Sequence, residues 1–473
     1  MVARVHVMVI GVLLSFVVCL SPAINQLVSS QGVPSPLVIP NPIPQPGAWF
    51  GYWVSTGDLN HDGVSDLVVG AYFADVAGQR DAGRVDVFLG GSNFTGSVAV
   101  SYHAPTPQAG GEFGVGVAIG DVNGDGFADL IVGSEGAQVG ALEGGRVFVY
   151  FGGPTLPDAI PDLILQAPQP QDKAEFGRRV ALGDINGDGA MDILVGAHLA
   201  DVGGQRDAGE VDVFLGGRTI DAIADAQLRA TTPQANALFG FSVVAGDINA
   251  DGFDDITVGA LLTDVAELTD AGRAEVFFGG ASLPRTSALT LEAPNPQAGA
   301  RFGFPVDVGD VNGDGVTDLL IGAYFTNVGN RLNAGKAFIY LGGRSFHSIP
   351  DYELASPQPR MGARFGYSFA VGDVIGDRRP DLVVGSDLAN LGPLLANAGE
   401  AVIYDGGVPF DGASAGPLQA PEPQRGGSYG FRLAVADLND DGRRDLIVTA
   451  IGTAVNSQRE AGAVFVYLSR SSR

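Results

Sequence analysis

The stretch "GDLNHDGVSDLVVGAY", residues 57–72, joins a polar loop to a run of strand-forming residues. Oxygen-bearing side chains stand at alternate positions, Asp58, Asn60 and Asp62, and Gly63 and Asp66 follow them. Taken alone, such a stretch is explained equally well by a polar turn, because Asp, Asn and Gly favour turns without any metal. The rest of the chain decides between a turn and a metal loop.

The same acidic phrase recurs at a fixed period along the chain. The spacing between successive copies is 63 residues in five cases and 64 in the last. A constant period of this kind identifies an internal repeat, in which each copy is one supersecondary unit. The first aspartates of the copies are Asp58, Asp121, Asp184, Asp247, Asp310, Asp373 and Asp437.

Each repeat divides into four short strands joined by turns. A first strand such as residues 115–120 leads into the acidic loop, and a second such as residues 129–133 leaves it. A third strand, for example residues 210–217, and a fourth, for example residues 163–168, complete the unit. Four strands per unit, repeated at this period, are typical of a β-propeller. The repeats open with the pairs Phe50-Gly51, Phe113-Gly114, Phe176-Gly177, Phe239-Gly240, Phe302-Gly303, Phe365-Gly366 and Tyr429-Gly430.

The two ends of the chain complement each other. The last repeat stops at its third strand, residues 461–470, and residues 37–51 align without a gap on the fourth-strand region of another repeat, residues 163–177. If Leu37–Ile39 pairs beside the seventh repeat, a ring closes and leaves no sheet edge open. A solenoid is the competing architecture, but solenoids need polar capping repeats, which these ends lack. The sequence therefore predicts an all-β fold, a seven-bladed β-propeller over residues 37–473 with four-stranded blades and a ring closed by the N-terminal strand.

Residues 1–23 have the pattern of a signal peptide. A basic residue precedes an apolar run, residues 7–20, and small residues suit a cleavage site near Ala23. The rival interpretations are a retained membrane anchor, for which the run is short, and lipidation at Cys19. Residues 24–36 would be a linker, and no later stretch is apolar for long enough to span a bilayer. We therefore expect a secreted product, outside the cell, at its surface or in a periplasm, without a transmembrane anchor after cleavage.

The charge balance is strongly acidic. The chain carries 27 Lys and Arg against 53 Asp and Glu, a net charge of −26. Nucleic-acid binders need a basic surface, so we expect no nucleic-acid partner. Cys19 is the only cysteine and lies in the signal segment, so the mature chain would contain no disulfide. Something else must hold the ring together.

The acidic loops have the donor pattern of a calcium loop. Calcium takes about six to eight oxygen ligands, and a loop can supply side-chain oxygens at positions 1, 3 and 5, a carbonyl at position 7 and a carboxylate at position 9. Glycine at position 6 permits the positive φ of the turn. A plain turn does not need three mutually repelling carboxylates, and magnesium prefers stricter octahedral geometry. The expected ligands are Asp58, Asn60, Asp62, Val64, Asp66; Asp121, Asn123, Asp125, Phe127, Asp129; Asp184, Asn186, Asp188, Ala190, Asp192; Asp247, Asn249, Asp251, Phe253, Asp255; Asp310, Asn312, Asp314, Val316, Asp318; and Asp437, Asn439, Asp441, Arg443, Asp445.

The sixth loop, "GDVIGDRRPD" at residues 372–381, departs from this pattern. Ile375 stands at position 3, and Arg378 replaces the turn glycine. We therefore expect about six calcium ions, with the sixth loop free of metal and Arg378 or Arg379 supplying the compensating charge.

The repeat phrase "FGxxVxxGDxNxDGxxDLxVGA", with the later "AGxVxVFLGG", resembles the FG-GAP repeats of the integrin α-subunit head. The resemblance covers essentially the whole chain after the signal segment, and it implies a secreted calcium-binding propeller that acts as an extracellular binding or adhesion module. Integrin-like adhesion is the weaker implication, because no Asp-x-Ser-x-Ser adhesion motif occurs and no inserted domain interrupts the period. FG-GAP propellers also accompany polysaccharide-active or lipase-type enzymes, so the fold alone does not settle activity.

The sequence contains no recognisable catalytic constellation. Histidines after the signal segment fall at unrelated phases of the repeat and are interpreted as scattered surface residues. Residues 412–416, Gly-Ala-Ser-Ala-Gly, match an esterase pattern formally, but no histidine follows to complete the triad order. We therefore do not expect an enzyme. The histidines in question are His61, His103, His198 and His347.

Strand alternation divides the propeller into two faces. The acidic loops join first and second strands on one face, whereas the more variable second-to-third loops, such as residues 72–83 and 387–399, lie on the other. Variable loops on a rigid scaffold commonly carry recognition, although loops also vary where nothing constrains them. We expect a monomer that binds an extracellular protein or glycan there. The alternative is a carbohydrate-active enzyme or accessory carbohydrate-binding propeller, to which Trp49 and Trp53, the only tryptophans, lend little support.

Overall fold

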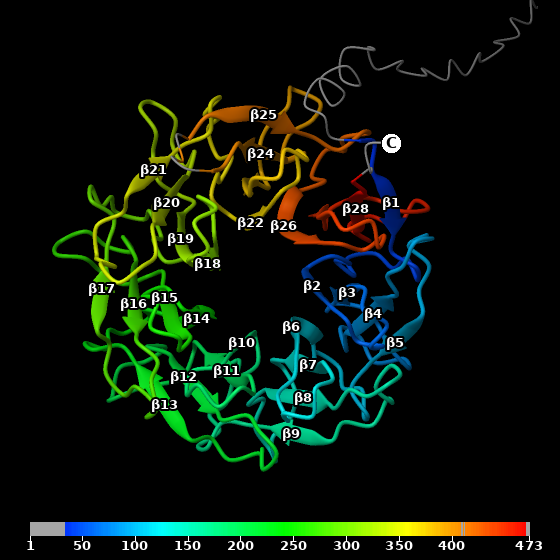
Figure 1. Ribbon diagram of the computed structural model, residues 1–473, viewed down its shortest axis with the longest axis vertical. Helices are drawn as coiled ribbons and strands as arrows, with labels where there is room; N and C mark the ends of the chain where they lie inside the picture. Colours follow the sequence, from blue (N-terminus) through cyan, green and yellow to red (C-terminus); the bar gives the residue numbers. More distant parts are fainter. Residues whose placement is uncertain (1–33, 408–409, 411, 470–473) are drawn as a thin grey trace, which may run out of the picture.

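The structure, a computed structural model, describes residues 34–407, 410 and 412–469. The predicted signal peptide, residues 1–23, and most of the predicted linker lie outside this range and stay predictions. The described chain forms seven four-stranded antiparallel sheets, arranged as blades around a central axis (Figure 1). The all-β, seven-bladed propeller expected from the repeat period is confirmed.

Within each blade the chain runs from the axis outward, so that the first strand of every repeat is the innermost one (Figure 1). The strands of the first four repeats are β2 (Trp53–Gly57), β3 (Asp66–Ala71), β4 (Arg84–Phe88), β5 (Val100–Tyr102); β6 (Phe113–Gly120), β7 (Asp129–Ser134), β8 (Arg146–Tyr150), β9 (Leu163–Leu165); β10 (Arg179–Gly183), β11 (Asp192–Ala197), β12 (Glu210–Phe214), β13 (Ala226–Arg229); and β14 (Phe239–Gly246), β15 (Asp255–Ala260), β16 (Arg273–Phe277), β17 (Leu289–Leu291). Those of the last three are β18 (Val306–Gly309), β19 (Asp318–Ala323), β20 (Lys336–Tyr340), β21 (Tyr352–Leu354); β22 (Phe369–Gly372), β23 (Asp381–Ser386), β24 (Glu400–Tyr404), β25 (Ser414–Leu418); and β26 (Tyr429–Ala436), β27 (Asp445–Ala450), β28 (Ala463–Tyr467).

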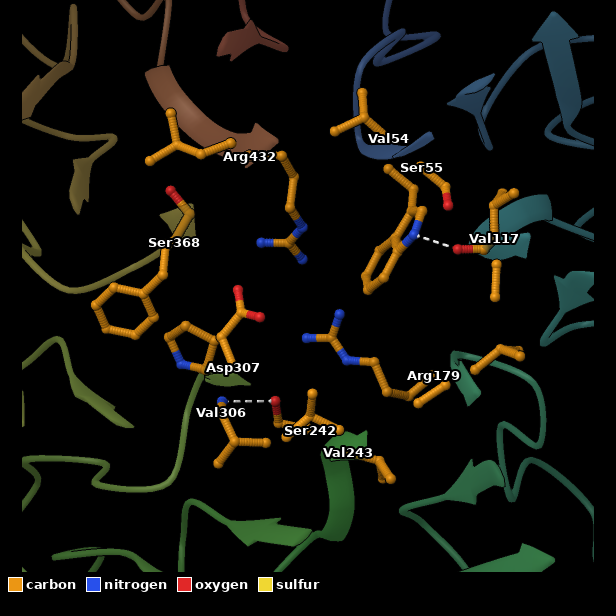
Figure 2. A pocket seen from close by; sticks show the side chains of 18 of the residues that line it. Val54, Ser55, Val117, Arg179, Ser242, Val243, Val306, Asp307, Ser368 and Arg432 are labelled. Atoms are coloured by element: carbon orange, nitrogen blue, oxygen red, sulfur yellow. Dashed lines mark hydrogen bonds between the residues drawn. The ribbon is translucent and has the colours of Figure 1, made fainter. Parts of the chain in front are cut away.

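The seventh blade takes its outer strand from the start of the chain. Strand β1 (Leu37–Pro40) pairs antiparallel with β28, and Val38 lies opposite Phe465. The sheet order is β1-β28-β27-β26, so the ring is closed by the N-terminal strand as predicted. The seven innermost strands surround a central cavity, to which every blade contributes side chains (Figure 2).

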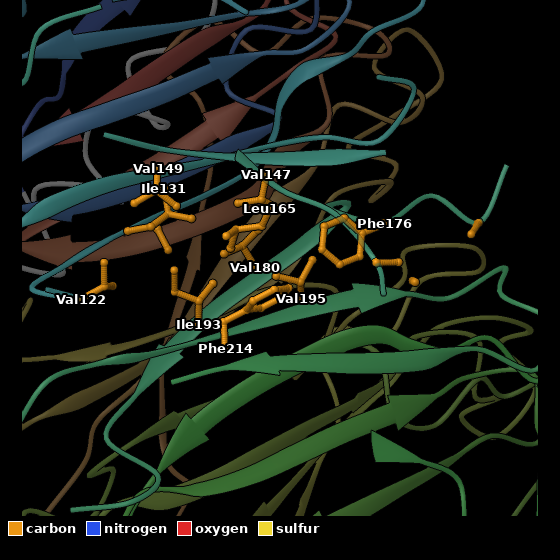
Figure 3. Close-up of a cluster of buried hydrophobic side chains, with 14 of the residues drawn as sticks. Val122, Ile131, Val147, Val149, Leu165, Phe176, Val180, Ile193, Val195 and Phe214 are labelled. Carbon is orange, nitrogen blue, oxygen red and sulfur yellow. The ribbon is translucent and has the colours of Figure 1, made fainter. Parts of the chain in front are cut away.

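The hydrophobic core lies between neighbouring blades. Ile131 and Val149 of one blade pack with Ile193 and Val195 of the next (Figure 3). The second strands are buried on both faces, as all six residues of β7 show. Neither face of such a strand contacts solvent, so its sequence is continuously apolar and does not alternate between apolar and polar residues.

The aromatic-Gly pair that opens each repeat links blades to each other. Phe176 is fully buried, and its ring centre lies 6.3 Å from that of Phe214 on the third strand of its own blade. The next residue, Gly177, has a φ of +95°, and a Cβ there would lie 2.6 Å from the carbonyl oxygen of Arg146 in the preceding blade. Any larger residue would push the two blades apart, so glycine is required at this contact.

Candidate functional site

The acidic loops follow the innermost strands, on one face of the ring, and Asp58 to Asp66 illustrate their internal geometry. The N–H of Asp62 lies 3.0 Å from Asp58 Oδ1 and 3.1 Å from Asn60 Oδ1, so the oxygens of positions 1 and 3 converge on one point. Gly63 has a φ of +88°, and its N–H donates to Asp58 Oδ2 at 2.8 Å. The turn geometry inferred for position 6 is therefore present.

The aspartate at position 9 is buried and fastens the loop to the blade. Asp66 is fully buried, and its two carboxylate oxygens accept the N–H groups of Leu59 at 2.9 Å and Gly90 at 2.8 Å. Gly90 follows the third strand, so one carboxylate joins the acidic loop to the far end of β4. Burial raises the pKa of Asp66 to about 6. Position 9 thus has a structural role in addition to the ligand role predicted for it.

The other faithful loops repeat both contacts. In each, the first aspartate accepts the N–H of the turn glycine, at distances of 2.7 to 2.9 Å. The buried aspartates that repeat the position-9 contacts are Asp129, Asp192, Asp255, Asp318 and Asp445. The sequence repeat is therefore also a repeat of loop geometry.

The donor set of these loops fits calcium in its chemistry. All predicted ligands are hard oxygens, which calcium prefers, and the oxygens of positions 1 and 3 already converge. Within the described residues, no three His, Cys, Asp or Glu side chains are gathered into a metal-binding cluster. Instead, the carboxylates accept backbone N–H groups and leave further lone pairs available. Calcium at these loops stays a prediction.

The sixth loop keeps the backbone shape but adds a positive charge. Arg378 takes the place of the turn glycine with a φ of +72°, and its N–H donates to Asp373 at 2.8 Å. The guanidinium of Arg379 lies 2.6 Å from Asp377 and 2.8 Å from Asp405. Of the two arginines considered, Arg379 supplies the ion pair. In the other loops, a bound cation would relieve the repulsion between the carboxylates. In the sixth loop, the guanidinium of Arg379 partly neutralises these negative charges.

On the opposite face, aromatic side chains gather around the mouth of the cavity. Tyr52 and Tyr72 are nearly buried, with ring centres 4.1 Å apart. Trp49 and Phe73 pack on them from the outer side, with ring centres 5.3 Å apart, and both are half-buried. A second aromatic cluster, around Phe304 and its neighbours, joins the first through Tyr367, whose ring centre lies 5.3 Å from that of Phe431. We call these two clusters the aromatic rim; its further members are Phe241, Tyr324, Phe325, Tyr367 and Phe431.

The residue before each aromatic-Gly pair adopts a left-handed backbone conformation in all seven repeats. Its φ lies between 51° and 60° in every case, a conformation that costs a non-glycine residue about 1 kcal/mol or more. The chemistry at this position differs from blade to blade, in contrast to the uniform acidic loops. The residues are Trp49, Glu112, Glu175, Leu238, Arg301, Arg364 and Ser428.

A partly buried charged cluster lies beside Tyr52 of the aromatic rim. Arg178 donates to Glu135 at 2.8 Å and to the Tyr52 hydroxyl at 3.0 Å, and it lies 3.6 Å from Glu175. Burial, together with the hydrogen bond to Glu135 and the charge of that residue, raises the pKa of Glu112 well above its usual range. The sequence pattern gave no signal for this cluster, because its members come from three different repeats.

One of the histidines was interpreted wrongly. His198 is only 3% exposed, and its Nε2 lies 3.2 Å from Glu175. It belongs to the charged cluster and is not a surface residue. His61 is exposed as expected, and its ring lies 4.6 Å from that of Phe127 in the neighbouring acidic loop. His198 and His61 lie on opposite faces, so the structure does not bring them together.

Glutamine side chains hold the bases of the loops that join second and third strands. The sequence analysis did not single out these glutamines. Gln45 donates to the carbonyl of Asp75 at 3.1 Å and accepts the N–H of the same residue at 2.6 Å. Gln171 makes the same two bonds with Asp201. Each glutamine lies 30 residues before its partner, and this repeated spacing is the sequence signal from which the contacts could have been predicted. These loops vary in sequence although their bases are fixed.

Comparison with known proteins identifies the class to which this fold and these loops belong. The FG-GAP repeat family matches residues 50–88, 113–150, 176–214 and 239–276, and the FG-GAP-like repeat family matches residues 310–384. Integrin alpha-5 of Xenopus laevis is 32% identical over 268 residues, 52% of this chain and 23% of the relative. The chain thus carries FG-GAP repeats and is an integrin-α-like FG-GAP propeller.

Two further relatives differ in how much of the chain they match. Integrin alpha-PS2 of Drosophila melanogaster is 34% identical over 174 residues, 33% of this chain and 12% of the relative. Phosphatidylinositol-glycan-specific phospholipase D of Homo sapiens is 27% identical over 403 residues, 77% of this chain and 46% of the relative. The chain therefore spans less than half the length of these relatives.

Among the described residues of this chain, no helix has the length and apolar character needed to span a membrane.

Proposed function

We propose that this chain is a calcium-stabilised propeller that acts outside the cell as a binding or adhesion module. Calcium would be held by the six faithful acidic loops, through side-chain oxygens at positions 1, 3, 5 and 9 and the carbonyl at position 7. The bound ions would neutralise the clustered carboxylates and would link each innermost strand to the second strand of its own blade. Relatives that include integrin α-subunits support this function.

The face opposite the acidic loops would bind the ligand. The observation that carries this proposal is the contrast between the two faces. One face repeats the same side chains in six blades, whereas the left-handed position on the other carries tryptophan, acid, base and aliphatic residues in turn. A surface that differs at each blade can recognise a particular partner, and the partner would be an extracellular protein or glycan.

The aromatic rim favours a glycan as one candidate ligand. Half-buried Trp49 and Phe73 lie beside the charged cluster around Glu135, and aromatic faces next to carboxylates suit sugar binding. A relative that matches 77% of this chain is named as specific for a phosphatidylinositol-glycan, which also supports a glycan ligand. A carbohydrate-active enzyme or accessory carbohydrate-binding propeller is therefore the second candidate function.

A binding screen with face-specific variants tests this proposal. The chain would be applied to glycan and extracellular-protein arrays in calcium and in chelator, together with Trp49→Ala on the proposed ligand face and His61→Ala on the acidic-loop face. Both residues have positive φ, and Trp49 is half-buried whereas His61 is exposed. We expect Trp49→Ala to lose binding and His61→Ala to keep it. The reverse result would move the ligand to the other face.

A further inference from the structure

The central cavity carries an unusual set of side chains. It has a volume of about 360 Å³ and is lined by residues from the innermost strand of every blade. Most of its wall is small and apolar, with valines such as Val54, Val117 and Val243. Two arginines, Arg179 from β10 and Arg432 from β26, enter it from different sides of the ring (Figure 2).

Both guanidinium groups stack on a tryptophan. The guanidinium carbon of Arg179 lies 4.5 Å from the centre of the Trp53 ring, and that of Arg432 lies 5.0 Å from it. Trp53 is fixed in turn by its own hydrogen bond, 2.6 Å from Nε1 to the carbonyl of Val117. The stacking holds two like charges in one cavity, so the arrangement needs a compensating negative charge.

The hydrogen-bonding capacity of the arginines is mostly unused. Arg179 is only 7% exposed, and its one side-chain hydrogen bond to the described residues runs from Nε to the carbonyl of Phe241 at 3.1 Å. Arg432 donates from Nη1 to the carbonyl of Phe431 at 3.3 Å, and its buried Nε has no hydrogen-bond partner within residues 34–407, 410 and 412–469. Each guanidinium has five donors. In the described part of the chain neither forms an ion pair with a carboxylate within 4.0 Å, so several donors face the cavity.

The charge inside the cavity is not balanced. Asp307 is the one acidic residue among the described residues that line it, and it accepts the N–H of Val308 at 2.9 Å. Burial lowers the pKa of Arg179 to about 9 and raises the pKa of Asp307 to about 6, so both remain charged at neutral pH. Two cations face one anion, which leaves one positive charge at the centre of a chain whose net charge is −26.

We propose that the central cavity is an anion-binding site, in which the guanidinium groups of Arg179 and Arg432 together hold the carboxylate or sulfate group of a small ligand. Arginine forks match the geometry of such planar or tetrahedral oxyanions, and bonds to an ionised group are strong in a poorly solvated cavity. The Ser55 hydroxyl also lines the cavity and offers another donor. The site lies apart from the acidic loops, and none of the residues that line it is a predicted calcium ligand. It adjoins the aromatic rim, because Tyr367 belongs to the rim and also lines the cavity.

The fluorescence of Trp53 gives a direct readout. The chain has two tryptophans, so Trp49→Phe leaves Trp53 as the only one, in contact with both arginines. This parent would be titrated with acetate, sulfate and glucuronate at constant ionic strength, with acetamide and glucose as the uncharged counterparts. We expect a saturable change with at least one of the anions and none with acetamide or glucose. No saturable change with any of the three anions would overturn the proposal, as would an equal response to the uncharged compounds.

Three substitutions in this parent locate the site. Arg432→Gln and Arg179→Gln should each weaken binding about tenfold or more, because each removes a charge-assisted contact. Arg80→Gln, at a side chain that is 84% exposed, is the control and should leave binding unchanged. Unchanged affinity in both cavity variants would overturn the proposal.

Asp307→Asn keeps the proposal testable even if the arginine variants fail to fold. Removing the competing carboxylate should tighten anion binding several-fold, and equal or weaker binding would count against the site. All measurements are made in calcium, with circular dichroism confirming the fold. A failed calcium prediction and a failed anion prediction are therefore distinguishable.

Discussion

The two faces of the propeller are built from the same repeat, yet they differ in how much each blade preserves. On the acidic-loop face, six loops keep the same side chains at positions 1, 3, 5, 6 and 9 and the same hydrogen bond from the turn glycine to the first aspartate. On the opposite face, the backbone is equally regular, with a left-handed residue before every aromatic-Gly pair, but the side chains differ. The comparison teaches that a shared backbone does not impose shared side chains. Uniform side chains therefore indicate a shared chemical requirement, and diverse ones leave room for recognition.

The largest expected effect is the response to calcium removal. An ion that binds only the folded chain adds about 2.7 kcal/mol to the free energy of unfolding when its free concentration is 100 times Kd. Six such ions would stabilise the fold by on the order of 10 kcal/mol, so chelation should lower Tm by more than about 10 °C. Scanning calorimetry in millimolar calcium and in chelator measures this. The same Tm in both buffers would mean that the acidic loops are empty turns.

Single loops should differ from each other in the same experiment. Asp121→Ala removes position 1 of a faithful loop, and Asp373→Ala removes the same position of the sixth loop, where the aspartate makes equivalent bonds to backbone N–H groups. In calcium, Asp121→Ala should cost about 2–3 kcal/mol more than Asp373→Ala, and in chelator the two should cost about the same. Calcium stoichiometry should fall from about six to about five only in the first variant. Equal losses in calcium would contradict a metal-free sixth loop.

The smallest expected effect concerns pH and the charged cluster on the face opposite the acidic loops. The pKa of Glu112 is raised by burial and by Glu135, so the folded chain binds this proton more tightly than the unfolded chain does. Above the ordinary value of 4.5, the unfolded state therefore holds fewer protons, and the free energy of unfolding falls as pH rises. Glu112→Gln should remove this contribution.

Urea unfolding of the parent and of Glu112→Gln between pH 5 and pH 9 checks the sign. The variant should gain stability relative to the parent as pH rises. A constant difference across this range would show that Glu112 does not titrate differently in the folded chain. His61→Ala, on the other face, serves as a control that should leave the pH dependence unchanged.

Nearly all of the fold could be predicted from the sequence, because each copy of the repeat supports the same assignment of strands and loops. A period of 63 residues, four strand-like segments and complementary ends leave few closed architectures, and the pairing of β1 with β28 is the one that was expected. The acidic loops were predictable for a similar reason. Their side chains come from one short segment, so that spacing alone brings Asp58, Asn60 and Asp62 together.

The cavity and the charged cluster could not be predicted in this way. Arg179 and Arg432 are separated by four blades in sequence and meet only because the ring brings all innermost strands to one axis. His198 was misinterpreted for a related reason, because its partner Glu175 lies before the first strand of the same repeat and only folding brings the two side chains together. A site built from several blades can be recognised in the sequence only when the residues at equivalent positions of all seven repeats are compared.

The pairing of β1 with β28 also sets an order for folding. Six blades are made of consecutive strands, so their strand pairs join segments that are close in the sequence. The seventh blade differs, because Val38 must find Phe465 across almost the whole chain. Contacts of such high sequence separation form slowly. During synthesis the first strand must therefore wait, unpaired, until the last strand has been made, and the ring can close only as a final step.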